Sequence, residues 1–208
     1  MTDDEEKRWS AYLYEDSAVL RNKKDIRYKA TWHGKERDYT SSRFATLPEL
    51  DFRPGSLVEN LKAVHFYLFQ DCYEWAGEFR NVDMGKSNPF HPGLFGFFCD
   101  YDKIPDELSK AQKISDALVE QAPSLSAEAK IKMLAQLHAA LNFAHPFREG
   151  NGRFTRAFME EIAEHVGIDL NFGLIDGDEM IAVSQKSMAQ PEGFKPLPFE
   201  ELYAKIAA

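Results

Sequence analysis

The segment "NFAHPFREGNGRFTRAF", residues 142–158, decides how this chain is interpreted. Between positions 145 and 156 it holds one histidine, one glutamate, one asparagine and three arginines, together with two glycines. Pro146 ends the apolar segment before it, because proline disfavours helical conformation in the preceding residue and cannot donate a backbone hydrogen bond. The pattern predicts a short polar loop between two helices.

The segments on both sides of this loop have the helical period. Upstream, apolar residues recur at three- and four-residue steps from Ile131 to Ala144, and Ser126 stands in the N-cap position. Downstream, a helix is expected over about 152–166, and Gly167 suits the left-handed position that ends many helices. The loop is therefore expected to join two core helices.

The rest of the chain is also predicted to be mostly helical. Apolar spacing and cap residues predict helices over about 57–76, 101–121, 177–189 and 198–206. Ser56 is expected to cap the first of these helices, with Gly77 as its stop, and Asp176 and Glu179 read as a capping box. Residues 79–98 predict a two-stranded flap with a turn-rich tip.

Residues 1–54 mix polar and apolar positions with little periodicity. They predict an irregular lead-in with short helices, packed on a main domain over residues 55–208. The fold class expected from the whole pattern is mostly α with one β-hairpin.

Composition narrows the functional classes. The chain has 208 residues, of which 44% are hydrophobic, and a formal net charge of −9. Such an acidic protein is a poor nucleic-acid binder, because that binding needs a basic surface that releases counterions. Residues 21–43 are the local exception, with eight Lys or Arg against three acids. We interpret that run as a solvated surface, and no nucleic-acid partner is expected.

No targeting or membrane segment is visible in the sequence. The N-terminus lacks a basic and then apolar signal, and no apolar run approaches 18 residues. The two cysteines, Cys72 and Cys99, are too few for a disulfide framework. We expect a protein that is cytoplasmic where it is synthesised and has no membrane partner. Delivery as a secreted effector, without a signal peptide of the usual kind, stays open.

The loop has the chemistry of a phosphate site. A helix N-terminus carries unpaired N–H groups and a partial positive charge. Gly150 and Gly152 let the backbone approach a ligand closely, and glycines before a helix start are typical of anion sites. Arg153 and Arg156 are three apart, so they lie on one face of the first turns, and arginine suits phosphate oxygens.

The remaining loop residues add an acid and a base. Glu149 is the only acid in the loop, and beside a polyphosphate a lone carboxylate is best explained as a Mg²⁺ ligand. His145 is the only loop group that takes up a proton near neutral pH. Phe147 is expected to pin the loop to the core. A metal-hydrolase interpretation is weak, because His138 and His145 have no third ligand at metal-site spacing.

The run "HPFREGNGRFTR" resembles the signature of the Fic family, His-Pro-Phe-x-(Asp/Glu)-Gly-Asn-Gly-Arg-x-x-Arg, at every fixed position. Upstream, "YEWAGEFRNVDMGK" is similar to the segment that leads into the Fic flap. The resemblance implies a Fic fold: a helical bundle whose β-hairpin flap, at about 79–98, covers a catalytic loop over residues 145–153.

The resemblance also implies an activity. Fic enzymes mostly transfer AMP from ATP to a Tyr, Thr or Ser hydroxyl of a target protein. By that match His145 takes the hydroxyl proton, Glu149 holds Mg²⁺, and Lys86 and Phe90 of the flap position the target chain. The implied nucleotide-binding residues are Phe147, Gly150, Asn151, Gly152, Arg153 and Arg156.

Regulation is expected to come from another polypeptide. Many Fic proteins are inhibited by a helix of pattern (Ser/Thr)-x-x-x-Glu-(Gly/Asn), whose glutamate the resemblance would pair with Arg153. Glu59, Glu149 and Glu192 are followed by Gly or Asn, but no Ser or Thr stands four positions earlier. We therefore expect a separate small antitoxin-like protein. The flap run "MGKSNPF" departs from the common Ser-Lys-Gly-Gly-Thr-x-Phe, which leaves the choice of target open.

Two alternatives to AMP transfer are carried forward. Fic relatives also move phosphocholine, UMP or phosphate groups, so the chain could be a transferase with another donor. It could also be a non-catalytic, nucleotide-dependent binding module, such as the toxin half of a regulatory complex. The resemblance implies a bacterial toxin or effector, and the target protein decides between these two roles.

Overall fold

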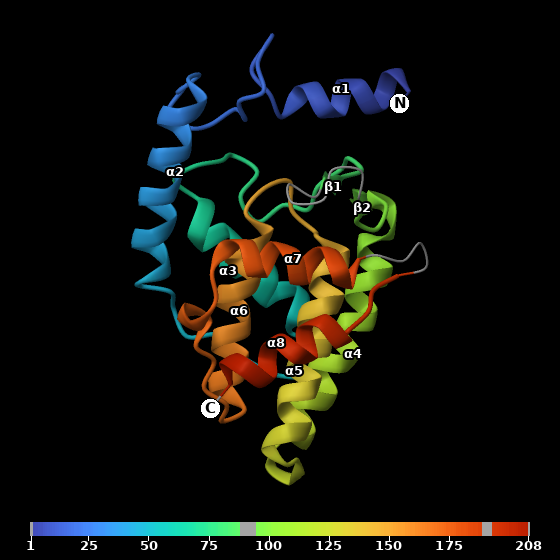
Figure 1. Ribbon diagram of the computed structural model, residues 1–208. Helices are drawn as coiled ribbons and strands as arrows, with labels where there is room; N and C mark the ends of the chain where they lie inside the picture. Colours follow the sequence, from blue (N-terminus) through green and yellow to red (C-terminus); the bar gives the residue numbers. More distant parts are fainter. Residues whose placement is uncertain (1, 88–94, 189–192, 208) are drawn as a thin grey trace.

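Helices α5 (Ala127–Ala144) and α6 (Asn151–His165) lie side by side in the middle of the protein. We describe residues 2–87, 95–188 and 193–207 of a computed structural model. Helix α4 (Ile104–Gln121) and helix α8 (Leu197–Ile206) pack on α5, and α3 (Leu57–Phe69) packs on α6 (Figure 1). The prediction of a mostly helical bundle is confirmed.

The residues at the ends of these helices agree only in part with the predicted caps. The Ser126 hydroxyl accepts a hydrogen bond from the Ala129 N–H at the start of α5, as predicted. Gly167, with φ +76°, follows α6 in the left-handed conformation. Asp176 caps α7 (Gly177–Ser187), but the Glu179 carboxylate pairs with Lys205 of α8 at 2.9 Å. Only one half of the expected capping box is therefore formed.

Helix α3 is shorter than predicted. It ends at Phe69, and the chain then turns through residues 70–76 before it reaches Gly77, whose φ is +83°. Ser56 stands at the N-cap, but its hydroxyl accepts from the Arg53 N–H and from Asn60 Nδ2, not from an N–H of the first helical turn. The predictions that Ser56 caps this helix through its side chain and that Gly77 stops it are wrong.

The lead-in is more regular than expected. It contains α1 (Asp3–Ala11) and a 16-residue helix, α2 (Lys29–Phe44), which lies along one side of the bundle and contacts α3 (Figure 1). Only Trp32, Glu36 and Thr40 of α2 are buried, at four-residue spacing. Because two of these three are polar, the helix has no apolar stripe, and a search for apolar periodicity misses it. The division at residues 54 and 55 stays a prediction.

The flap is a short antiparallel hairpin. Strand β1 (Gly85–Ser87) pairs with β2 (Phe95–Phe97), and Gly85 lies opposite Phe97. The predicted tip residue Phe90 lies outside the described residues. Three 3₁₀ segments complete the fold in the described ranges, at Tyr101–Lys103, Ala122–Ser124 and Phe172–Leu174. No helix among the described residues is long and apolar enough to cross a lipid bilayer.

Candidate active site

The candidate site is the loop between α5 and α6. His145 ends α5 in the left-handed conformation, with φ 41° and ψ 58°, and its N–H donates to the Leu141 carbonyl at 2.9 Å. This conformation is uncommon for a residue other than glycine. Pro146 follows, and a following proline disfavours the right-handed helical conformation that would continue α5. The imidazole stacks on Phe98, the residue after strand β2, with ring centroids 3.5 Å apart and planes at 8°. The histidine is therefore held at both backbone and ring.

Arg80 fastens the loop to the base of the flap. Its side chain is buried, and burial lowers the pKa of the guanidinium, which nevertheless stays charged at neutral pH. The guanidinium donates to the carbonyl oxygens of Val82, Cys99, Ala144 and His145. The Arg80 backbone N–H donates to the Pro146 carbonyl at 2.8 Å. No carboxylate of the described residues forms a salt bridge with Arg80. The positive charge of its guanidinium is therefore stabilised by the hydrogen bonds to these carbonyl oxygens.

His65 holds the other end of the loop. The Gly77 N–H donates to His65 Nδ1 at 2.9 Å, so the ring proton is on Nε2 and is donated to the Glu149 carbonyl at 3.0 Å. The ring also stacks on Phe147, with centroids 3.7 Å apart. Burial lowers the pKa of His65 to about 3, which keeps the ring neutral. No sequence pattern singles out His65, because both of its hydrogen-bond partners are backbone groups, 12 and 84 residues further along the chain.

Two predicted nucleotide-binding residues brace the loop instead. Phe147 is fully buried, as expected for a residue that pins the loop, so its ring is not available to a ligand. The buried Asn151 side chain accepts from the Phe147 N–H at 3.0 Å and donates to the Phe147 carbonyl at 2.7 Å. The amide is therefore used inside the loop. The Asn151 amide thus bonds to the Phe147 backbone in this structure, and the assignment of both residues to nucleotide binding stays a prediction.

The two glycines of the loop differ. Gly150 has φ +81°, and a Cβ at this position would lie 2.1 Å from Cζ of Phe69. Gly152 has no positive φ, and nothing lies within 4 Å of its would-be Cβ. Packing thus explains why residue 150 is glycine. Open space at Gly152 agrees with the prediction that a ligand approaches the backbone there.

The start of α6 is suited to an anion. Gly150 is the N-cap and has no side chain, and the first turn contains no acidic residue. The partial positive charge of the helix end is therefore not offset by a capping group. Arg153 adds a full charge two residues into the helix, and its guanidinium lies 4.8 Å above the Phe69 ring.

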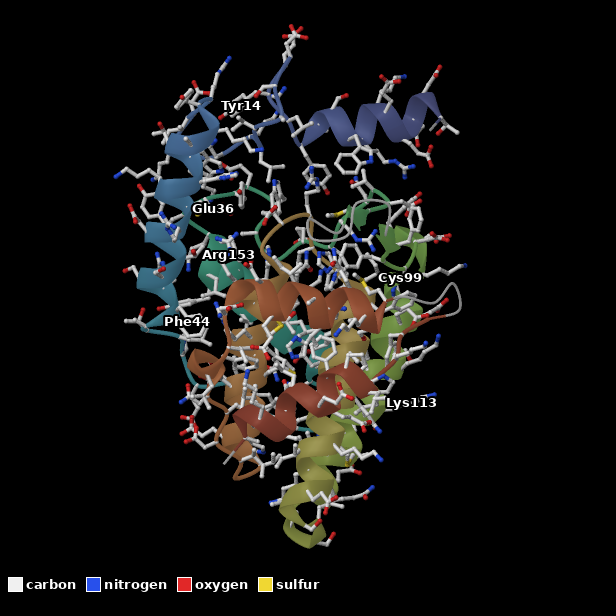
Figure 2. All side chains as sticks on the ribbon, in the orientation of Figure 1. Tyr14, Glu36, Phe44, Cys99, Lys113 and Arg153 are labelled. Carbon is white, nitrogen blue, oxygen red and sulfur yellow. The ribbon has the colours of Figure 1, made fainter. Side chains whose placement is uncertain are left out.

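Arg153 has three polar partners from two parts of the chain. Its Nη2 donates to Glu36 Oε1 at 3.0 Å and to Glu149 Oε1 at 3.4 Å, and Nη1 donates to Thr40 Oγ1 at 3.3 Å. Glu36 and Thr40 belong to α2, so the lead-in completes the site (Figure 2). No pattern in the sequence indicates this contact.

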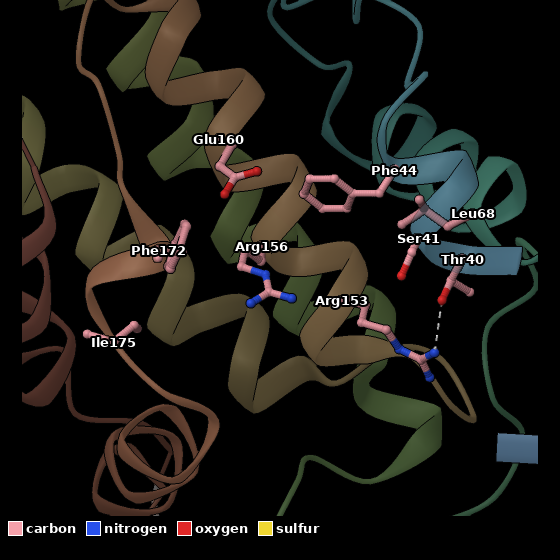
Figure 3. Close-up of a pocket in the computed structure, with 10 residues that line it drawn as sticks. Thr40, Ser41, Phe44, Leu68, Arg153, Arg156, Glu160, Phe172 and Ile175 are labelled. Carbon is pink, nitrogen blue, oxygen red and sulfur yellow. Dashed lines mark hydrogen bonds between the residues drawn. The ribbon is translucent and has the colours of Figure 1, made fainter. Parts of the chain in front are cut away.

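Arg153 and Arg156 both line a cavity of about 450 Å³ between α2, α6 and the Phe172–Leu174 turn (Figure 3). Two hydroxyl groups, of Thr40 and Ser41, face the same cavity, and the rest of its wall is mainly apolar. Glu160, one turn beyond Arg156, also lines it, and burial raises the pKa of Glu160 to about 6. The cavity has room for negatively charged groups beside two guanidinium groups.

A divalent cation fits this site only together with a phosphate ligand. Among the described residues no group of three or more His, Cys, Asp and Glu side chains could hold a metal ion. The Glu149 carboxylate is 42% exposed and accepts from its neighbour, the Gly150 N–H, at 2.9 Å. A single accessible carboxylate suits Mg²⁺, which usually keeps waters and takes phosphate oxygens.

The flap residues are only partly placed. The backbone of Lys86 pairs with Gly96 in the hairpin, and its predicted partner in target positioning, Phe90, lies outside the described residues. Their roles toward a target stay predictions.

Comparison with known proteins agrees with the loop chemistry. The Fic/DOC family model matches residues 56–163, just over half of the 208-residue chain. The chain is 32% identical over 166 residues to "Probable protein adenylyltransferase Fic" of Escherichia coli K12. The aligned region covers 77% of this chain and 76% of that protein. It is 29% identical over 178 residues to "Protein adenylyltransferase VbhT" of Bartonella schoenbuchensis, covering 85% of this chain but 35% of that protein.

Solved structures show the same fold. The BepC protein of Bartonella tribocorum, with bound AMPPNP, superposes with a TM-score of 0.82 at 22% identity, covering 96% of this chain and 97% of that one. The N-terminal Fic domain of a putative cell filamentation protein of Bartonella quintana, with bound ADP, gives 0.80 at 26% identity, covering 95% and 94%. From the signature, the fold and these relatives, the chain belongs to the Fic/DOC family.

Proposed function

We propose that this chain is a protein adenylyltransferase, which transfers AMP from ATP to a Tyr, Thr or Ser hydroxyl of a target protein. The observation that carries the proposal is that one short loop holds His145 at the end of α5 and leads to the N-terminus of α6, which has no side-chain cap and is followed by Arg153 and Arg156. The names of the curated relatives and the nucleotides bound in similar structures support it.

The reaction needs one base and a held triphosphate. His145 accepts the proton of the target hydroxyl, the hydroxyl oxygen forms a bond to the α-phosphorus, and the bond to the leaving pyrophosphate breaks. Arg80 and Phe98 hold the His145 backbone and ring before substrate arrives. Positioning of this kind lowers the barrier without further chemistry by the protein.

The phosphates are bound at the start of α6. Backbone N–H groups at Gly152 and the helix end face the anion, while Arg153 and Arg156 neutralise the β- and γ-phosphates. Glu149 would hold Mg²⁺ together with the phosphates, and the ion would supply further positive charge toward the leaving pyrophosphate. The Glu149 carboxylate would then give up its contact with Arg153.

The target is held by the flap. A target segment that adds to the hairpin edge gains main-chain hydrogen bonds without a strict sequence requirement. Lys86 and Phe90 are the residues proposed to contact it.

The biological setting is proposed from the same relatives. BepC is described as a VirB-translocated effector and BepA as a type IV secretion system effector. We propose a bacterial toxin or effector that is made in the cytoplasm and has a small inhibitory antitoxin as partner, because the inhibitory glutamate pattern is absent from the sequence. The proposal of an antitoxin would be contradicted by two findings together. The purified chain would transfer AMP at full rate whether or not a partner is added, and no neighbouring gene would encode the inhibitory pattern.

Mass spectrometry of modified protein tests the activity against its alternatives. Cell lysate incubated with the chain and ATP should yield an AMP adduct on Ser, Thr or Tyr, and the His145→Ala variant should yield none. A UMP, phosphocholine or phosphate adduct that is absent from lysate without the chain would point to another donor. No adduct with any of these donors would favour a binding module.

A further inference from the structure

Glu36 is a buried carboxylate in contact with the candidate phosphate site. It lies in the middle of α2, with its side chain 8% exposed. One oxygen, Oε1, accepts two hydrogen bonds, from Tyr73 Oη at 2.9 Å and from Arg153 Nη2 at 3.0 Å. The Tyr73 hydroxyl in turn accepts from Trp32 Nε1 at 3.1 Å. A chain of hydrogen bonds thus runs from the inner face of α2 to the first turn of α6.

Two carboxylates share the same nitrogen of Arg153 but differ in their surroundings. Glu36 approaches from the protein interior and is held from behind by Tyr73, so it has no solvent to move into. Glu149 is 42% exposed and its contact with Nη2 is longer, at 3.4 Å. The Glu36 contact is therefore the fixed one, and the Glu149 contact is the one that a ligand can replace.

The remaining contacts also orient the guanidinium. Phe69 packs against it, and Thr40 accepts from Nη1 at the weak distance of 3.3 Å. Arginine binds phosphate well because its N–H groups form a rigid fork, but this requires the fork to be oriented before binding. Glu36 makes the shortest of the polar contacts that set this orientation.

We propose that Glu36 is a positioning residue for nucleotide binding: it anchors Arg153 so that the guanidinium receives the terminal phosphates and Glu149 is released. This inference rests on the proposed function, because it assigns Arg153 to the phosphates. It also gives the lead-in helix α2 a part in the site, although α2 lies outside the residues that the family model matches.

The competing possibility is that Glu36 blocks Arg153. The residues around it, "WHGKER", do not fit the inhibitory pattern, because Trp32 stands four positions earlier and Arg37 follows. Glu36 also occupies the interior side of a guanidinium whose side chain is 30% exposed. If Glu36 blocked Arg153, or acted only through its negative charge, its removal would tighten the binding of a polyphosphate. If Glu36 anchors Arg153, its removal weakens that binding, so the two hypotheses predict opposite changes in affinity.

Calorimetric binding of AMPPNP and of AMP to the full chain tests the anchor. In Glu36→Gln the dissociation constant for AMPPNP should rise on the order of ten-fold, as for loss of a hydrogen bond between charged groups. AMP, which lacks the terminal phosphates, should bind within about two-fold of wild type, the scatter expected for a contact left intact. Tyr73→Phe keeps the ring and should weaken AMPPNP about three-fold, and Glu36→Asp should recover part of the loss.

Asp38→Asn is the matched control, because it removes an exposed negative charge two residues along α2. It should leave both ligands unchanged. Melting curves show whether each variant is folded. If Glu36→Gln does not fold, AMPPNP binding by Tyr73→Phe tests the anchor in its place. Tighter AMPPNP binding in Glu36→Gln, or equal loss for AMPPNP and AMP, would overturn the anchor alone. A wild-type chain that binds AMPPNP no better than AMP would overturn the phosphate site of the proposed function, and the anchor with it.

Discussion

Replacement of Gly150 by alanine should destabilise the whole domain, because the backbone of this loop residue lies against the buried ring of Phe69. Its φ of +81° is a left-handed conformation, and a Cβ would lie 2.1, 2.5 and 2.8 Å from three atoms of the Phe69 ring. Phe69 is fully buried and cannot rotate away into solvent.

Two contributions add in the Gly150→Ala variant. The left-handed conformation costs a residue with a Cβ about 1–2 kcal/mol. Displacing the ring in a packed core costs about 1–3 kcal/mol more. The expected loss in the free energy of unfolding is therefore about 2–5 kcal/mol, which for a chain of this size lowers Tm by on the order of 10 °C.

Differential scanning calorimetry of Gly150→Ala and Gly152→Ala gives a matched comparison within one loop. At Gly152 nothing lies within 4 Å of the would-be Cβ and φ is not positive. Alanine is the better helix former there by up to about 1 kcal/mol, so Tm should stay constant or rise. The two substitutions should shift Tm in opposite directions or, at the least, by clearly different amounts.

A double variant separates the backbone contribution from the ring contribution. In a Phe69→Ala background the clash is absent, so adding Gly150→Ala should cost only the backbone part, about 1–2 kcal/mol. Equal Tm values for Gly150→Ala and Gly152→Ala would refute the argument from Phe69. So would a Gly150→Ala substitution that costs as much stability in the Phe69→Ala background as in the wild-type chain.

Three further predictions concern other contacts. Arg80→Gln leaves buried carbonyls, including that of His145, without donors and should cost at least about 2 kcal/mol in urea unfolding; a loss below 0.5 kcal/mol, the usual size of a surface effect, would contradict the clamp. Burial lowers the pKa of His65 and His138 to about 3, against about 6.5 when unfolded. The unfolded state therefore takes up protons first, and the unfolding free energy should fall below about pH 6.5, by up to about 1.4 kcal/mol per pH unit for each histidine; an unchanged Tm from neutral pH down to about pH 5 would contradict this. Ser126→Ala should cost about 1 kcal/mol by the same urea assay, because the cap of α5 is lost, while Ser124→Ala, outside the cap, should cost less.

The helix–loop–helix at residues 127–165 could be predicted because its signals are local. Apolar spacing, the Ser126 cap and Pro146 all act on their immediate neighbours in the chain. Helix α2 could not be predicted in the same way, because its buried line includes Glu36 and Thr40, whose burial depends on a partner more than 100 residues away. Polar residues buried by long-range contacts leave no periodic trace in a sequence.

The site shows the same division. His145, Glu149 and the two arginines stand out by residue type and spacing, and the structure brings Arg153 and Glu149 into contact. Arg80 and His65 act through backbone carbonyls and N–H groups, which every residue has, so no pattern of side chains reveals their partners. For Asn151, the sequence suggests a polar group for a ligand, and only the folded loop shows that the amide is already used.

The central claim is that His145 promotes transfer of the AMP part of ATP to a protein hydroxyl. It is tested most directly by incubating lysate protein with the chain and ATP labelled at either the α- or the γ-phosphate. Relative to lysate without the chain, we predict that the chain adds label to protein from α-labelled ATP only, and that His145→Ala adds none. Label that the chain adds from γ-labelled ATP, or equal addition by wild type and His145→Ala, would contradict the claim.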